Sequence, residues 1–238
     1  MKTTKLTTLV ALVLALVAGL AQPFTAAAQT QSVAERVAAL KASLATSQII
    51  LKQYEWIETT AISLKGEEKS RKLNRCYYGA DGGVQKILLT APAPEKKRRG
   101  LRGRIAEKKT EELTDYMQQA VALVKSYVPP NPALIQAAKD AGKVSLSLVE
   151  PGKRARLDFR DYHKPGDTLG VEVDLASNRL LGLTVKTYLE DAKDAVTLTA
   201  RTGQLNDGTT YPDAITLDAP AKKLKVNVDN SGYRKTSN

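Results

Sequence analysis

Few side chains in this sequence are of the types that catalyse reactions or bind metal ions. The chain has one histidine, His163, and one cysteine, Cys76. Zinc sites built from paired histidines or clustered cysteines are therefore excluded. A serine–histidine–aspartate triad would have to use His163, and no G-x-S-x-G sequence is present to supply its serine. We interpret His163 as a solvated histidine in the turn DYHKPGD. Cys76 is interpreted as a small buried apolar side chain, with an interchain disulfide as the alternative.

Carboxylates are the remaining groups with the chemistry of an active site. Asp158, Asp161 and Asp167 lie close together in the sequence, and Asp207 and Asp213 flank a turn. Paired carboxylates hydrolyse glycosides only at a set separation, and the repeated acidic positions of a calcium loop are missing around LNDGTTYPD. Glycine-rich phosphate-binding motifs are also absent. We therefore interpret these acids as turn and strand residues, and we expect no enzyme activity, no cofactor and no metal.

The strongest binding signal is a basic segment, EKKRRGLRGRIAEKK, at residues 95–109. It holds eight Lys or Arg and two Glu. Two interpretations remain open. The segment is either a solvated, mobile loop, because blocks of like charge tend to stay disordered, or it is attracted to an anionic surface such as phospholipid headgroups, lipopolysaccharide or an acidic partner. The cations that would contact such a surface are Lys96, Lys97, Arg98, Arg99, Arg102 and Arg104.

The N-terminal sequence is typical of a secretory signal peptide. Two lysines precede an apolar run from Leu6 to Leu20, which is shorter than the ~20 residues that span a membrane. Ala-Ala-Ala at 26–28 gives an A-x-A cleavage pattern before Gln29. We therefore expect a signal peptide at 1–28 and a periplasmic or secreted single domain at 29–238. Nucleic acid is not an expected partner, because an exported protein rarely meets it and residues 95–109 have no aromatic side chain to stack on bases.

The elements that would position these residues begin with an amphipathic helix at about 33–53. Ser32 and Glu35 form a capping box, and apolar residues that include Leu40 and Leu44 recur at helical spacing. β-Branched and aromatic residues follow, with Gly-Ala-Asp-Gly-Gly as a hairpin turn. They predict an antiparallel meander of strands near 54–65, 70–79 and 84–91.

A helical hairpin is predicted at 110–142. Glu111, Glu112 and Asp115 would sit in the first turn of its first helix, where the helix dipole favours negative charge. Asn131 would cap the second helix, with Pro132 at its first position.

The rest of the chain alternates between apolar and polar residues, as strands do. Leu169, Val171 and Val173 would face one way, and Leu181, Leu183 and Val185 would return on the next strand. Because the helices interrupt the sheet, the pattern predicts one α+β domain with a curved antiparallel sheet.

The layout resembles the periplasmic lipoprotein-carrier superfamily, the LolA/LolB-like proteins, most of all in DLASNRLLGLTVKTYL and LNDGTTYPDAITLDAP. The resemblance implies an incomplete β-barrel that wraps around helices and leaves an apolar cavity for acyl chains. The chain departs from that family in its low aromatic content, 5%, and in its basic insertion. A carrier or sensor of a lipid or acyl-chain ligand is the first functional hypothesis. The alternative is an envelope interaction protein with a filled core that docks on an anionic surface or acidic partner through the basic segment.

Overall fold

The computed structural model describes residues 33–90 and 101–236. The predicted signal peptide, the capping residue Ser32 and the cations Lys96, Lys97, Arg98 and Arg99 lie outside the described residues. The helices are α1 (Val33–Leu51), α2 (Leu101–Lys125) and α3 (Pro132–Asp140). The strands are β1 (Tyr54–Leu64), β2 (Glu67–Tyr78), β3 (Val84–Leu88), β4 (Val144–Glu150), β5 (Arg154–Arg160), β6 (Thr168–Asp174), β7 (Arg179–Tyr188), β8 (Ala195–Gln204), β9 (Thr210–Ala219) and β10 (Leu224–Lys235).

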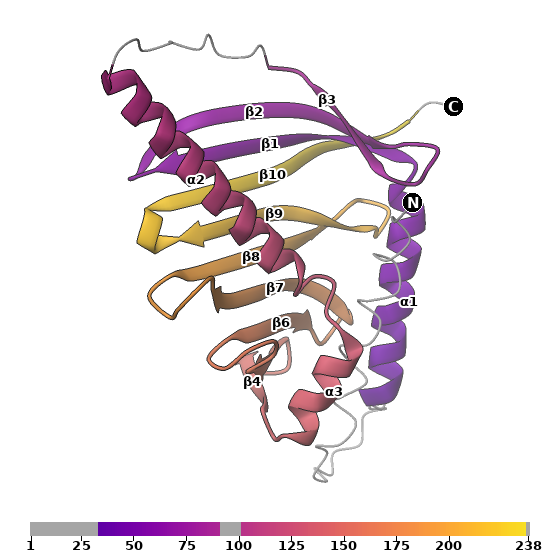
Figure 1. The fold of residues 1–238 in the computed structure, drawn as a ribbon. Helices are drawn as coiled ribbons and strands as arrows, with labels where there is room; N and C mark the ends of the chain where they lie inside the picture. The colour runs from indigo at the N-terminus through magenta and orange to yellow at the C-terminus, as the bar shows by residue number, and fades with distance from the viewer. Residues whose placement is uncertain (1–32, 91–100, 237–238) are drawn as a thin grey trace.

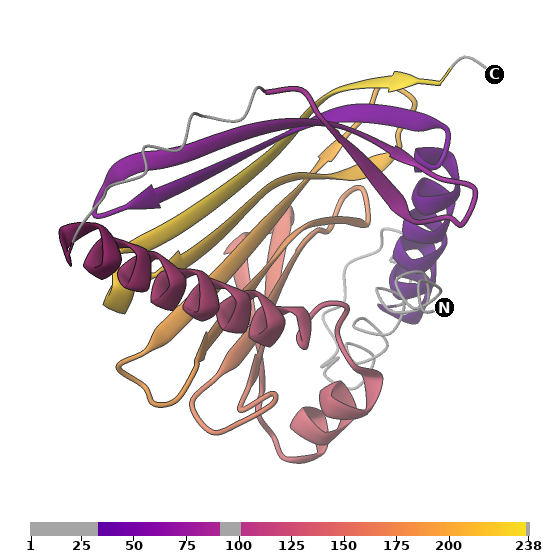
Figure 2. The same cartoon turned by 45° about the horizontal axis from the view of Figure 1, so that its top comes forward.

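All ten strands form one antiparallel sheet in the order β3-β2-β1-β10-β9-β8-β7-β6-β5-β4. The predicted meander β1-β2-β3 is confirmed, and β4 to β10 form a second meander. Pairing of β1 with β10 joins the two meanders and places Leu64 opposite Leu224. Strands β3 and β4 are the two edges, so the sheet curves without closing (Figure 2). The predicted α+β class with an incomplete barrel is confirmed.

One helix, α2, crosses the sheet diagonally and defines what we call the inner face (Figures 1 and 2). Tyr116, Ala120 and Val124 of α2 are buried in one core cluster with Val196 and Leu217 of the sheet. Their spacing of four residues puts them on one side of the helix. The middle of the inner face is therefore covered by α2.

The helices α1 and α3 cover the inner face toward β5, β6 and β7. Leu40 and Leu44 of α1 are buried in a second core cluster with Ile135 of α3 and with Phe159 and Leu169 of the sheet. The expected burial of Leu40 and Leu44 is confirmed. The capping of α3 is confirmed as well, because the Asn131 side chain accepts a hydrogen bond from the Ala133 backbone N–H at 2.9 Å.

Helix α2 begins earlier than the sequence pattern predicted. It starts at Leu101, so residues 101–109 of the basic segment are helical rather than part of a loop. Glu111, Glu112 and Asp115 consequently lie well inside the helix and not in its first turn, which contains no acid. Arg, Ala, Glu and Lys are all good helix formers, and their propensity outweighs the mutual repulsion of the positive charges here.

A β-bulge changes which face one predicted core residue points to. Gly182 pairs with Glu172, but the next pair is Leu180 with Val173, so Leu181 is an extra residue in β7. Leu180 is buried at 8% exposure, while Leu181 lines the outer surface of the sheet. The prediction that Leu181 shares a face with Leu183 and Val185 was therefore wrong, because an inserted residue reverses the alternation.

Among the described residues, no helix has the length and apolar composition needed to cross a membrane.

Candidate functional site

Apolar side chains on the inner face are exposed at both edges of the sheet. The register places Leu88 of β3 opposite Asn74 of β2, and Asn74 opposite Glu58 of β1. Glu58 lies on the same face of β1 as Ile62. Ile62 packs against the α2 cluster, so Leu88 and its alternate neighbour Val84 also face inward. They are 49% and 43% exposed. The helices therefore leave this edge of the inner face uncovered.

The opposite edge has the same character. Leu146 and Leu148 of β4 lie opposite Leu157 and Ala155, which are buried in the core beneath α1 and α3. Directly opposed residues point to the same face of a sheet. Leu146 is 45% exposed and Leu148 is 59% exposed. The inner face therefore ends in exposed apolar residues at β3 and at β4.

An ion pair lies on the inner face between these apolar residues at the β3 edge. The Nζ of Lys86 donates to both carboxylate oxygens of Glu58 at 2.6 Å. The Nδ2 of Asn74 donates to Oε1 of Glu58 at 3.3 Å. Glu58 is 9% exposed, so its charge is held by these two partners. Long-range pairing of β1, β2 and β3 brings the three side chains together.

The neighbouring row of inner-face residues joins Trp56, Cys76 and Lys86 across the same three strands. Trp56 donates from Nε1 to Oδ1 of Asn230 at 3.0 Å, and Cys76 is fully buried. Removal from water raises the pKa of the Cys76 thiol, and the nearby Glu58 carboxylate raises it further. The prediction that Cys76 is a buried apolar side chain is confirmed.

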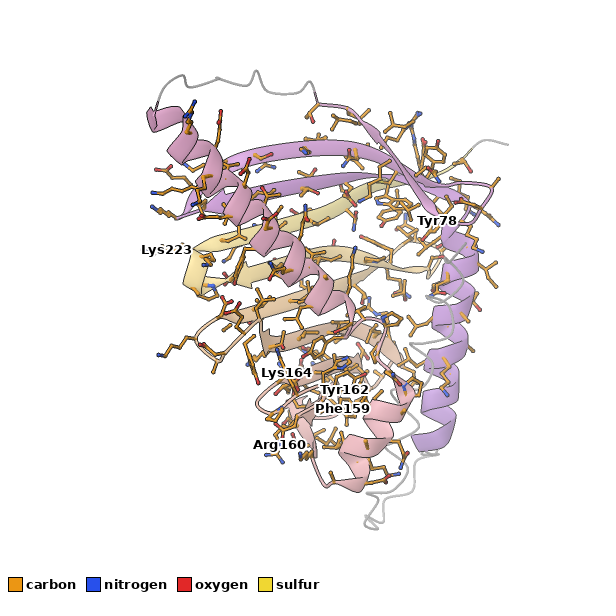
Figure 3. All side chains as sticks on the ribbon, viewed as in Figure 1. Tyr78, Phe159, Arg160, Tyr162, Lys164 and Lys223 are labelled. Atoms are coloured by element: carbon orange, nitrogen blue, oxygen red, sulfur yellow. The ribbon has the colours of Figure 1, made fainter. Side chains whose placement is uncertain are left out.

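An aromatic cluster borders this row at the end of β2. The ring of Trp56 stacks on Tyr233 with centroids 5.5 Å apart, and it lies 5.6 Å from Tyr78. Tyr78, labelled in Figure 3, is the last residue of β2. Burial raises the pKa of Tyr78 and of Tyr233. Both hydroxyls therefore stay protonated at neutral pH, and that of Tyr233 donates a hydrogen bond to the carbonyl oxygen of Pro212 at 3.3 Å.

The carboxylates considered as catalytic groups are each engaged by a separate partner. Asp158 pairs with Arg156 at 2.8 Å, and Asp161 pairs with Lys143 at 3.0 Å. The pKa of Asp161 is lowered by a hydrogen bond from the backbone N–H of Gly166 and by one from the Lys143 side chain. These bonds hold turns and strand neighbours together, as the sequence interpretation expected.

Asp207 and Asp213 likewise have separate partners. Asp207 accepts a hydrogen bond from the Tyr54 hydroxyl at 2.7 Å, and Asp213 pairs with Arg201 at 3.2 Å. Hydrogen bonds from Thr209 and Tyr54 lower the pKa of Asp207 to about 2. A carboxylate with so low a pKa stays ionised at neutral pH and is poorly suited to act as a general acid.

His163 is exposed and lies in the turn between β5 and β6, as expected. Its Nε2 is 2.9 Å from the carbonyl oxygen of Ser126, and its ring contacts the ring of Tyr127 edge-on at 4.5 Å. The turn itself is held by the buried Asp167, whose carboxylate accepts backbone N–H groups from Tyr162, His163 and Lys164. Tyr162 and Lys164, which belong to this turn, are labelled in Figure 3. We therefore interpret His163 as a residue that supports the structure of this turn.

Of the basic residues selected from the sequence, Arg104 has a described side chain, and it is exposed on α2. Arg102 belongs to α2, but its side chain lies outside the described part of the chain. Lys108 and Lys109, in the following turn of α2, are exposed as well. The described cations of the segment are therefore open to solvent on the first part of the helix.

A cavity on the outer face of the sheet was not predicted. It has a volume of about 300 Å³, and its lining includes Arg154, Arg156 and Arg201. Gly170 and Gly182 also line it, and a side chain at Gly182 would approach the carbonyl oxygen of Ala200 to 2.5 Å. Each arginine is paired with an acid: Arg154 with Glu150 and Glu172, Arg156 with Asp158, and Arg201 with Asp213. The sequence signal that could have indicated this cavity is the presence of glycines between apolar residues in β6 and β7.

Comparison with known proteins finds no matching family model and no matching curated protein. The chain is similar to two solved structures. One is a LolA superfamily protein from Nitrosomonas europaea, with 11% identity, a TM-score of 0.36, and coverage of 83% of this chain and 94% of that one. The other is a DUF1329 family protein from Desulfovibrio piger, with 12% identity, a TM-score of 0.32, and coverage of 82% of this chain and 92% of that one.

Proposed function

We propose that this protein binds an apolar ligand, such as a lipid or an acyl chain, on the inner face of its open sheet and carries or senses it without transforming it. The observation that carries the proposal is the exposure of inward-facing Val84, Leu88, Leu146 and Leu148 at the two edges of the sheet. Exposed apolar patches bounded by polar residues commonly mark sites of ligand or partner binding. Export through the sequence at 1–28 would place this site in the periplasm or outside the cell, and N-terminal sequencing of the mature protein tests that step.

Adjacent residues of β3 provide a matched test. Leu88 faces inward and is 49% exposed, whereas Ile87 faces outward and is 40% exposed. Leu88→Glu and Ile87→Glu therefore place the same charge on the same strand but on opposite faces. Binding of the uncharged apolar dye phenylnaphthylamine is followed by its fluorescence, and circular dichroism checks that both variants fold.

The expected result is asymmetric. Leu88→Glu should weaken dye binding by roughly tenfold or more, because losing contact with one buried leucine costs about 1.5–3 kcal/mol. Ile87→Glu should bind as the parent does. Equal weakening by both variants, or no dye binding by the parent, would show that the inner face is not the ligand site.

A second candidate function is docking on an anionic surface through the basic segment. The exposure of Arg104, Lys108 and Lys109 on α2 supports it. Basic residues near an anionic bilayer each contribute ~1 kcal/mol of attraction. Such docking is compatible with ligand transport, because it would bring the carrier to a lipid surface.

A further inference from the structure

The pair Glu58–Lys86 lies within the apolar edge of the proposed ligand site. Lys86 stands between Val84 and Leu88 on the inner face of β3. Alternate residues of a strand are about 7 Å apart, so a ligand whose polar end lies beside Val84 or Leu88 has its headgroup within reach of the Lys86 ammonium. The Lys86 side chain is 49% exposed and that of Glu58 is 12% exposed. Lys86 is therefore the more accessible member of the pair, and Glu58 keeps a smaller exposed fraction.

The pair keeps unused hydrogen-bonding capacity of both kinds. An ammonium has three N–H donors, and Lys86 directs contacts to two oxygens of Glu58. A carboxylate has about four lone-pair positions, and the described contacts of Glu58 are those with Lys86 and Asn74. A headgroup placed here could both accept a hydrogen bond and donate one. Hydroxyl groups do both.

The charge of the pair is already balanced. Glu58 carries one negative charge and Lys86 one positive charge at 2.6 Å. A bound amphiphile displaces water from this edge, and an unpaired charge in a place without water is costly. A ligand that brings its own net charge would create that situation. A ligand with an uncharged headgroup would leave the pair balanced.

We propose that the Glu58–Lys86 pair selects amphiphiles with an uncharged, hydroxyl-bearing headgroup, of the monoacylglycerol type, over amphiphiles of the same chain length that carry a net charge. This inference rests on the proposed ligand site of the inner face and names the headgroup class of its ligand. The Glu58–Lys86 pair is the recognition element, and Val84 and Leu88 contact the chain.

Trp56 provides the readout for a binding test. It is the single tryptophan of the chain, and it lies on the same face, in the row that includes Cys76 and Lys86. The full protein is titrated with monolaurin, laurate and dodecylammonium below the concentrations at which they aggregate. Trp56 emission is recorded, and equilibrium dialysis gives the affinities. Monolaurin should bind roughly tenfold more tightly than either ion, as an uncompensated charge at a half-buried site would require.

Two substitutions should exchange this preference in opposite directions. Glu58→Gln keeps the size of the side chain and leaves the Lys86 cation unpaired, so laurate should gain affinity and become the preferred ligand. Lys86→Gln leaves the Glu58 anion unpaired, so dodecylammonium should gain instead. Lys72, on the same face of β2 and opposite Thr60, is the matched control, and Lys72→Gln should preserve the preference for monolaurin.

The outcomes separate this inference from the proposed function. If none of the three amphiphiles binds the parent protein, the proposed ligand site itself is wrong. If all bind but without preference, or if the order is unchanged in Glu58→Gln, the site stands and headgroup selection by the pair is wrong. A change of preference in Lys72→Gln equal to that in Lys86→Gln would also overturn it, because the effect would then come from the general charge of the face. If Lys86→Gln does not fold, Glu58→Gln alone decides.

Discussion

The hydroxyl of Tyr127 donates a hydrogen bond to Oδ2 of Asp167 at 2.5 Å, and both side chains are fully buried. Tyr127 follows the last turn of α2, and Asp167 immediately precedes β6. The same hydroxyl lies 2.8 Å from Oγ1 of Thr187 in β7. This contact therefore anchors the end of the helix that crosses the inner face to the turn between two strands.

Tyr127→Phe should destabilise the fold by ~1–3 kcal/mol, because a buried carboxylate loses one of its donors. The measurement is urea unfolding followed by circular dichroism. Tyr188→Phe is the matched control, since its hydroxyl makes a solvent-exposed hydrogen bond to the Pro165 carbonyl, and it should change stability by less than about 0.5 kcal/mol. Equal effects of the two variants would show that the Asp167 contact does not stabilise the fold.

Leu44→Ala should cost ~2–5 kcal/mol of unfolding free energy, the usual range for removing a buried leucine side chain. Leu44 is 9% exposed in the core beneath α1. Ile49→Ala on the same helix is the control, because Ile49 is 64% exposed and its truncation should fall within about 0.5 kcal/mol. A change at Leu44 no larger than that at Ile49 would mean that α1 does not belong to the core.

Cys76 should react slowly with thiol reagents in the folded protein. Its side chain is fully buried, and desolvation raises the pKa of its thiol. The thiolate is the reactive species. A raised pKa therefore lowers the fraction of Cys76 that is present as thiolate at a given pH. Labelling followed by mass spectrometry should be far faster in denaturant than in native buffer. Similar rates in the two conditions would contradict the burial of Cys76.

Neutralising Lys96, Lys97, Arg98 and Arg99 together by substitution with Gln should weaken binding to anionic vesicles and flatten its dependence on salt. Stability should hardly change, because we expect these four charges to be solvated, and solvated charges contribute little to it. Zwitterionic vesicles are the control, and neither the parent nor the variant should bind them strongly. If the variant binds anionic vesicles as well as the parent at low salt, the segment does not dock on anionic surfaces.

Local sequence signals predicted most of the elements. The Gly-Ala-Asp-Gly-Gly turn forms as expected, with the Gly83 N–H donating to Asp81 and Gly82 at a positive φ of 73°. The alternating pattern predicted for the rest of the chain corresponds to β4 to β10. Such signals are reliable because a turn or cap depends on residues that are close in sequence.

Two local predictions failed because a neighbouring effect competed with the pattern. The first helix of the hairpin was predicted to begin at about residue 110, but good helix formers extend α2 back to Leu101. The alternation through Leu181 was broken by the bulge in β7, which no pattern of apolar residues reveals because an inserted residue is itself apolar here.

The amino-acid sequence alone thus determined the α+β class, the positions of the strands and the absence of paired-histidine or multi-cysteine chemistry, because these follow from composition and short-range periodicity. The tertiary structure decided that β1 pairs with β10, that α2 covers the middle of the inner face, and that Lys86 meets Glu58. Glu58 and Lys86 are 28 residues apart. The local sequence around each residue does not distinguish a charge that is solvated from one that is held in an ion pair. Only the register of three strands places the two charges together within an apolar edge.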